Sequence, residues 1–240
     1  PKLAKAVFSD AGLFLTLTLN GASDKGVSIS LPSAFDCNEL LEFDGDVLAT
    51  CLFTTDSTIV ATLGAGANLT VGASVVLKKE KLMAADYVTE CYGEKTDDAL
   101  VTYCEKYASN VENSVVSTVP ASAIQPNIII SAPSIIGSCD SLKIDIGASF
   151  GSAARPWKSI TWTVTGDADN DPAPSNEQNT ILTEQLNGQV ASYLDGSIVE
   201  FELQNVTIGT FTVSLELENW LEQKSILAHV FEETKKYRKN

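Results

Sequence analysis

The sequence predicts an all-β protein of two β-sandwich modules joined by a short, disulfide-pinned helical connector. Three observations predict this class. Short alternating apolar and polar runs recur, clusters of Gly, Asn, Asp and Ser separate them, and helical spacing over several turns occurs only in the middle. The 240 residues suffice for two modules of roughly 100 residues each. We expect modules at residues 1–80 and 126–232, a connector at 81–125 and a basic tail at 233–240.

The first 80 residues alternate as strands do. Within Leu13–Leu19 the leucines share one face, while Phe14, Thr16 and Thr18 share the other. Asn20-Gly21 then marks a turn. Further strands are expected at Val47–Phe53, Thr58–Leu63 and Ser74–Leu77, with a short helical turn at Asp36–Leu41.

The middle of the chain changes character. Thr96 or Asp97 can cap a helix whose residues Leu100, Cys104 and Tyr107 share one face. Ser117–Pro133 follows as an extended, proline-containing segment, which is typical of a stiff linker.

The second module is expected to contain seven or so short strands. Leu142, Ile144 and Ile146 point one way on their strand, and Ile160, Trp162 and Val164 share a face on the next. We therefore place Trp162 in the core, and Trp157, beside Pro156 and Arg155, at a surface. Arg155 either pairs with a loop carboxylate or is solvated. The remaining expected elements are a short helix at Ile181–Leu186 and strands at Ile198–Phe201, Gly209–Leu217 and Ile226–Phe231.

Five cysteines indicate a disulfide framework. Cys37 and Cys51, and likewise Cys91 and Cys104, have the close spacing of local bridges in secreted proteins. Cys139 is then left over, either unpaired or bridged to another chain. Reduced, buried thiols of an intracellular protein are the alternative. Two glycosylation sequons, at Asn68 and Asn205, favour the extracellular interpretation.

The charge balance excludes two classes of partner. The net charge is −15, and Lys and Arg are scarce outside the tail, so neither nucleic acid nor an anionic membrane surface is expected. The longest uncharged apolar run is too short to span a bilayer, so no membrane insertion is expected either.

Few residues point to chemistry. His229 is the single histidine and lies in an apolar strand pattern, so we expect a strand-face residue, no nucleophilic triad and no enzyme. Asp167, Asp169 and Asp171 crowd oxygen donors into one loop, as hard cations prefer. This loop is the candidate calcium site; a solvated acidic loop is the alternative, and no other cofactor is expected.

Two stretches resemble a known family. Ile136–Cys139, Leu142, Ile144, Gly151, Arg155 and Ile160–Val164 resemble the start of a receptor-for-egg-jelly/PKD-like module, and Gly209–Trp220 resembles its penultimate strand and Asn-aromatic corner. The first 80 residues are similar to a β-repeat that often precedes it, through Ala6–Gly12, the cysteine pair and the Leu63-Gly64 turn. Large surface proteins of ciliates, algae and other unicellular eukaryotes carry such modules. The resemblance implies an extracellular, Ig-like structural or adhesive unit.

The function that we expect is structural. The chain would be a glycoprotein repeat or subunit of a surface filament, flagellar hair or cell coat. It would assemble through β-sandwich contacts, including exposed edge strands, with copies of itself or other extracellular proteins. The alternative is a monomeric adhesion or receptor module at the cell surface that binds a glycan or a protein partner, with calcium as a possible requirement.

Overall fold

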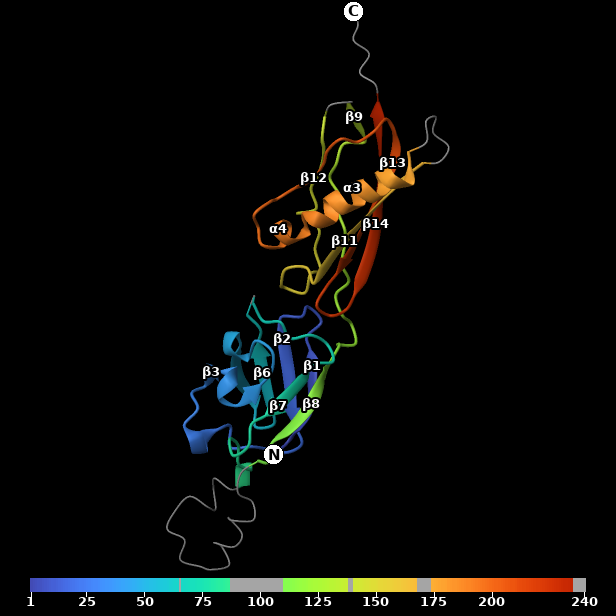
Figure 1. Ribbon diagram of the computed structural model, residues 1–240. Coiled ribbons are helices and arrows are strands. Elements are labelled where there is room, and N and C mark those ends of the chain that lie inside the picture. Colours follow the sequence, from blue (N-terminus) through green and yellow to red (C-terminus); the bar gives the residue numbers. More distant parts are fainter. Residues whose placement is uncertain (65, 87–109, 138–139, 168–173, 235–240) are drawn as a thin grey trace, which may run out of the picture. The chain divides into compact units, whose positions relative to one another are not determined.

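The computed structural model describes residues 1–64, 66–86, 110–137, 140–167 and 174–234 (Figure 1). The chain divides into two compact units: residues 1–124 with 153–155, and residues 125–152 with 156–240. No helix among the described residues is long and apolar enough to cross a membrane.

The first unit is built on one sheet, in the order β3-β5-β6-β2-β1-β8-β7-β4. All neighbouring strands are antiparallel except β1 and β8, which run parallel. The strands are β1 (Leu3–Phe8), β2 (Phe14–Leu19), β3 (Ala34–Asp36), β4 (Leu41–Glu42), β5 (Thr50–Thr55), β6 (Thr58–Thr62), β7 (Ser74–Leu77) and β8 (Asn113–Thr118); short 3-10 turns are η1 (Val27–Ile29), η2 (Cys37–Glu39) and η3 (Asp46–Leu48).

The sheet of the first unit curls back on itself. Strands β3 and β4 stand at opposite ends of the strand order, yet only Cys37–Leu40 separate them in the chain. The five steps from Asp36 to Leu41 span at most about 18 Å, so the two ends of the order lie close together. Cys37, in η2, forms a disulfide with Cys51 on β5, which confirms the first predicted bridge. The helical turn expected at Asp36–Leu41 is this 3-10 turn.

The alternation predicted for β2 is confirmed. Leu15, Leu17 and Leu19 are buried, whereas Leu13 lies before the strand and is exposed. Strand β8 is a difference, because its residues were expected to belong to the connector. It pairs with both β1 and β7, and Asn113 fixes its start by bonding the backbone N–H and C=O of Leu3.

The second unit has two β layers, one with the order β11-β13-β14-β9 and one of β10-β12. Its strands are β9 (Ile135–Gly137), β10 (Leu142–Ile144), β11 (Ser159–Gly166), β12 (Phe201–Leu203), β13 (Gly209–Glu218) and β14 (Lys224–Thr234), and its helices are α3 (Asn176–Gly188) and α4 (Val190–Leu194). The predicted short helix is thus present, and α3 extends beyond it in both directions.

The first strand segment of this unit switches between the layers. Asn127 and Ser131 bridge to Phe150 and Asp145 beside β10, and the chain then pairs as β9 in parallel with the end of β14. The third strand, β11, carries the buried Trp162. This connectivity and the buried tryptophan are features of an Ig-like sandwich.

The core of the second unit lies between the two layers. Trp162 is only 1% exposed and meets Phe201 edge-on, with ring centroids 5.0 Å apart, while Phe211 stacks on Phe231. The faces predicted to be buried on β10, β11 and β13 are all buried: Leu142, Ile144, Ile146, Ile160, Trp162, Val164, Phe211, Val213, Leu215 and Leu217.

Helix α3 covers the edges of both layers on one side of the sandwich (Figure 1). Asn187 accepts from Trp162 N–H and donates to Trp162 C=O, both at 2.9 Å, and Thr183 accepts from Val164 N–H. Gln189, directly after α3, makes the same kind of two-way bonds to the backbone of Glu202 on β12, and Gln185 makes them to the backbone of Gln204 just after β12. The side chains of one helix therefore take the place of a missing strand.

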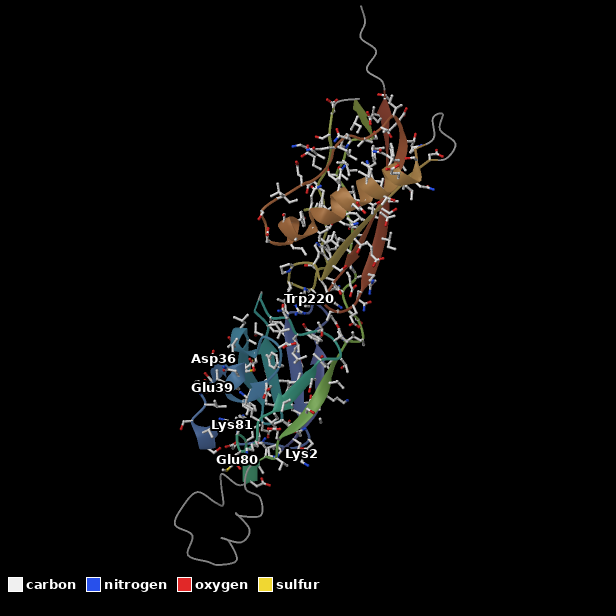
Figure 2. The ribbon with its side chains drawn as sticks, viewed as in Figure 1. Lys2, Asp36, Glu39, Glu80, Lys81 and Trp220 are labelled. Atoms are coloured by element: carbon white, nitrogen blue, oxygen red, sulfur yellow. A yellow bond between two sulfur atoms is a disulfide. The ribbon has the colours of Figure 1, made fainter. Side chains whose placement is uncertain are left out.

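An asparagine organises the turn between β13 and β14. Asn219 is fully buried; its side-chain oxygen accepts from Leu221 and Gln223 N–H, and its amide donates to Gly151 C=O. The next residue, Trp220 (Figure 2), donates its indole N–H to Pro156 C=O. The predicted Asn-aromatic corner is thus a hydrogen-bonded hairpin end.

Candidate functional site

Most of the predicted cation and thiol sites fall outside the described residues. This applies to Cys91, Cys104, Cys139, Asp169 and Asp171; Asp167 is described, and its N–H donates to Thr210 C=O. Among the residues that the structure describes, no group of three or more His, Cys, Asp or Glu is placed to hold a metal ion. The calcium site therefore stays a prediction.

Both sequon asparagines are exposed. Asn68 follows the buried Ala67, and Asn205 follows β12 in a left-handed conformation with φ of 55°. Their side chains are thus accessible to a glycosylating enzyme, and the glycans themselves stay a prediction.

His229 lies on strand β14, as the sequence predicts, and it faces Val213 on β13. Its Nε2 is 3.4 Å from Pro133 C=O, and the ring is partly exposed.

Two residues near the opening of β11 differ from expectation. Arg155 is 5% exposed rather than solvated, and its guanidinium donates to Ala67 and Leu69 C=O, both at 2.9 Å, within the first unit. Burial lowers the pKa of Arg155 to about 10. Trp157 is 8% exposed rather than at a surface, because it packs into the core of the second unit.

Trp157 also lines a cavity of about 410 Å³ in the second unit. Tyr193, Leu194, Ile198 and Val199 contribute to the largely apolar wall. A cavity with an indole and a phenol in its wall can accept a small apolar or sugar-like group.

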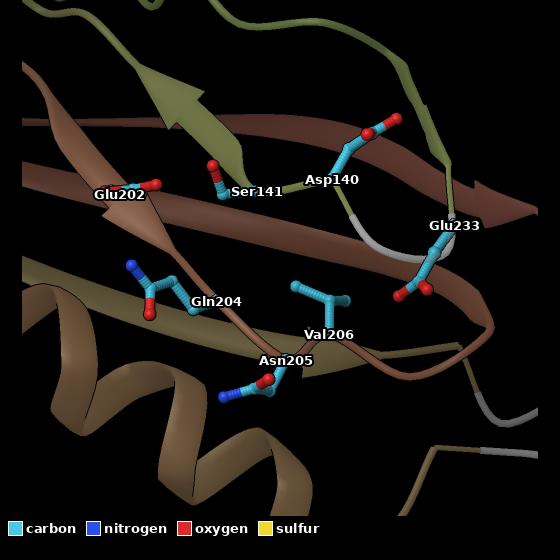
Figure 3. A pocket seen from close by; sticks show the side chains of 7 residues that line it. All are labelled: Asp140, Ser141, Glu202, Gln204, Asn205, Val206 and Glu233. Carbon is cyan, nitrogen blue, oxygen red and sulfur yellow. The ribbon is translucent and has the colours of Figure 1, made fainter.

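A second cavity, of about 470 Å³, lies between the ends of β10, β12 and β14 (Figure 3). Polar groups dominate its lining, which consists of Asp140, Ser141, Glu202, Gln204, Asn205, Val206 and Glu233. In Figure 3 the Asp140 carboxylate turns away from Glu233, and Glu202 lies at the opposite end, so the three carboxylates do not converge on one point. The cavity can offer hydrogen bonds to a ligand, but it lacks the convergence of donors that a metal ion needs.

Glu233 is the unusual group in this cavity. It is 5% exposed, and none of the described residues gives its Oε2 a hydrogen bond. Burial raises the pKa of its carboxyl above the ordinary value.

The most extended candidate site is the outer edge of β14. Strand β13 pairs with β14 along its whole length, but β9 pairs with it only from Glu232 to Thr234. The side chains of Ile226 and Val230 are 67% and 53% exposed, and Ala228 between them is also exposed. Figure 1 shows β9 beside the final part of β14, and no other described strand pairs with this edge.

The sequence of β14 departs from the alternation expected for a strand with one solvent-exposed face. An antiparallel strand with one wet face normally alternates apolar with polar residues. Ser225–Phe231 instead has apolar residues on both faces, so its outward face is apolar as well.

No protein-family model and no curated protein matches the chain. Several solved structures align over nearly its whole length at low similarity. One is the N-terminal Ig1-2 module of the Drosophila receptor protein tyrosine phosphatase DLAR, 11% identical over 99% of this chain and 97% of that one, with a TM-score of 0.26.

Two others are similar in degree. The fibronectin(III)-like modules of Clostridium thermocellum CbhA are 12% identical over 99% of this chain and 94% of theirs, with a TM-score of 0.30. Murine CEACAM1b is 8% identical over 98% of both chains, with a TM-score of 0.29. Scores of this size do not carry a fold assignment, which rests here on strand connectivity and Trp162.

Proposed function

We propose that this chain is an extracellular structural protein, a repeat or subunit of a surface filament or coat, and that it assembles through the open edge of β14. One observation carries the proposal: the second unit closes the edges of both layers with α3 but leaves an apolar stripe on β14 exposed. Open apolar edges recruit further strands, so proteins normally cover or charge them.

Two further features support the proposal. The Cys37–Cys51 disulfide is typical of an oxidising compartment outside the cytosol. The open stretch from Ser225 to Phe231 contains no Lys, Arg, Asp, Glu or Pro, the residues that usually protect an edge.

Sedimentation velocity over a wide concentration range tests the proposal, with electron microscopy of the largest species. We expect reversible association that strengthens with salt, because screening reduces repulsion between copies of net charge −15. A chain that stays monomeric at millimolar concentration and physiological ionic strength would overturn the proposed assembly.

The second candidate function is a monomeric module that binds a glycan or a protein partner. The cavity beside Trp157 and Tyr193 favours it, because aromatic rings in a cavity wall bind sugars and small apolar groups. A glycan array distinguishes the two functions: strong retention of one glycan class, abolished by Tyr193→Ala in a protein that remains monomeric, would support the binding module.

A further inference from the structure

We infer that the partner of the β14 edge is a second copy of the same strand, paired antiparallel about a two-fold axis at Leu227. This inference rests on the proposed assembly through β14 and adds its partner and its register.

The first step is which backbone groups point outward. Glu232 donates its N–H to Ser134 C=O, on the side away from β13. In an antiparallel ladder the outward-pointing residues alternate, so Lys224, Ile226, Ala228 and Val230 also direct their N–H and C=O away from β13. The bonds of β13 support this assignment. Thr210 and Glu218 face Glu232 and Lys224 in the ladder, and their C=O groups accept bonds from the β11 side and not from β14.

The second step is the length of the open edge. It begins at Lys224, where β14 starts, and ends before Glu232, whose N–H is already engaged. In the described part of the chain, Ile226, Ala228 and Val230 have no partner for their outward N–H groups. The segment before β9 does not fill this position, because it meets β14 through the side chains of Ser225 and His229, on the core-facing side.

The third step is the register. A copy related by a two-fold axis at Leu227 places Lys224 opposite Val230 and Ile226 opposite Ala228, which uses the whole open span. Each of these pairs joins two outward-pointing residues, so each can exchange two hydrogen bonds. An axis moved to Ala228 or beyond would bring the partner's Lys224 to the level of Glu232, where β9 already lies.

The side chains fit the same register. Leu227 belongs to the core-facing side but is 40% exposed, and the axis places it against the copy's Leu227. On the outer face the two apolar stripes meet.

Charge complementarity favours a second copy over an unrelated strand. Lys224 lies at one end of the open edge and the exposed Glu232 just beyond the other. The antiparallel two-fold brings each Lys224 diagonally to the Glu232 of the copy, which is within reach for long side chains. Lys224 also lies on the outer face, where its Nζ is 2.8 and 3.3 Å from the carboxylates of Glu216 and Glu218 on β13.

A cysteine trap tests the register. In a Cys139→Ser background, which removes the predicted unpaired thiol, Leu227→Cys should form an intermolecular disulfide under mild oxidation. Facing residues of a non-hydrogen-bonded pair lie about 4.5 Å apart at Cα, within the range that a disulfide spans. Peptide mapping should identify the 227–227 link, and Thr163→Cys, on the outer face of the covered strand β11, should give at least tenfold less dimer.

A second pair of variants keeps the test decisive if Leu227→Cys does not fold. Ile226→Cys and Ala228→Cys, both at exposed positions, should each form little homodimer alone but a 226–228 heterodimer when mixed. Association of the parent chain without either link would overturn the register while leaving assembly intact. Absence of any association would overturn both the register and the proposed function.

Discussion

The strand edges on the two sides of the second unit differ in whether their backbone N–H and C=O groups are hydrogen-bonded. On one side Gln185 and Asn187 of α3, and Gln189 directly after it, bond the backbone at the edges of β11 and β12, so another strand cannot pair there. On the other side, the described residues supply no partner for the outward N–H groups of Ile226, Ala228 and Val230 on β14, whose side chains are exposed. We therefore expect substitutions at the covered edge to change stability, and substitutions at the open edge to change the proposed association.

The largest expected effect on stability comes from shortening a buried side chain on β11, compared with shortening an exposed one on β14. Trp162→Ala removes a fully buried indole from the covered strand and should lower the free energy of unfolding of the second unit by about 3–5 kcal/mol. Ile226→Ala, at the open edge, should change it by less than about 0.5 kcal/mol, because the side chain is already exposed. Urea denaturation followed by tryptophan fluorescence and circular dichroism measures both; equal losses would contradict the comparison.

A smaller effect is expected from uncovering the closed edge. Asn187→Ala leaves the N–H and C=O of Trp162 without their side-chain partner, so it should destabilise the second unit by about 1–3 kcal/mol. Glu184→Ala, an exposed change on the same helix, is the matched control and should stay within about 0.5 kcal/mol of the parent. If both variants unfold alike, the helix does not act as an edge cover.

The smallest expected effect concerns pH. The pKa of the Glu233 carboxyl is raised by burial, so above the ordinary value of 4.5 the folded state binds more protons than the unfolded state. Its contribution to stability is therefore full at acidic pH and is lost as the pH rises through the folded-state pKa. Glu233→Gln should be more stable than the parent at neutral pH, by a margin that shrinks as the pH falls through the folded-state pKa and is largely lost below the ordinary value of 4.5.

Thermal unfolding at a series of pH values measures this margin. Glu184→Gln, which removes a carboxyl at an exposed position outside the cavity of Glu233, serves as a control for charge. A margin that is constant across pH would show that burial of the Glu233 carboxyl has no energetic consequence.

Much of the β architecture could be predicted because alternation reports burial directly. Leu15, Leu17 and Leu19, and the inner faces of β10, β11 and β13, are buried as the pattern requires. The spacing of Cys37 and Cys51 likewise predicted a bridge that the structure contains.

Other features could not be predicted because polar residues take unusual places. In β8, Ser117 is buried and bonds Thr70 C=O while Val116 is exposed, so the strand does not show an inward apolar face. Helix α3 covers the strand edges through the amide side chains of Gln185 and Asn187. Their backbone partners, Gln204 and Trp162, are distant in the sequence. Trp157 belongs to a core cluster whose members are spread over the whole second unit, which no local pattern reveals.

The most direct test of the central claim is the oligomeric state of Ala228→Pro. Proline removes an outward N–H from the open edge without breaking a bond to β13, so the strand should remain folded while a partner strand is blocked. By sedimentation velocity the parent chain and Ala228→Ser should associate reversibly, and Ala228→Pro should remain monomeric with an unchanged circular dichroism spectrum. A folded Ala228→Pro variant that associates as strongly as the parent would contradict the claim that the β14 edge is the assembly surface.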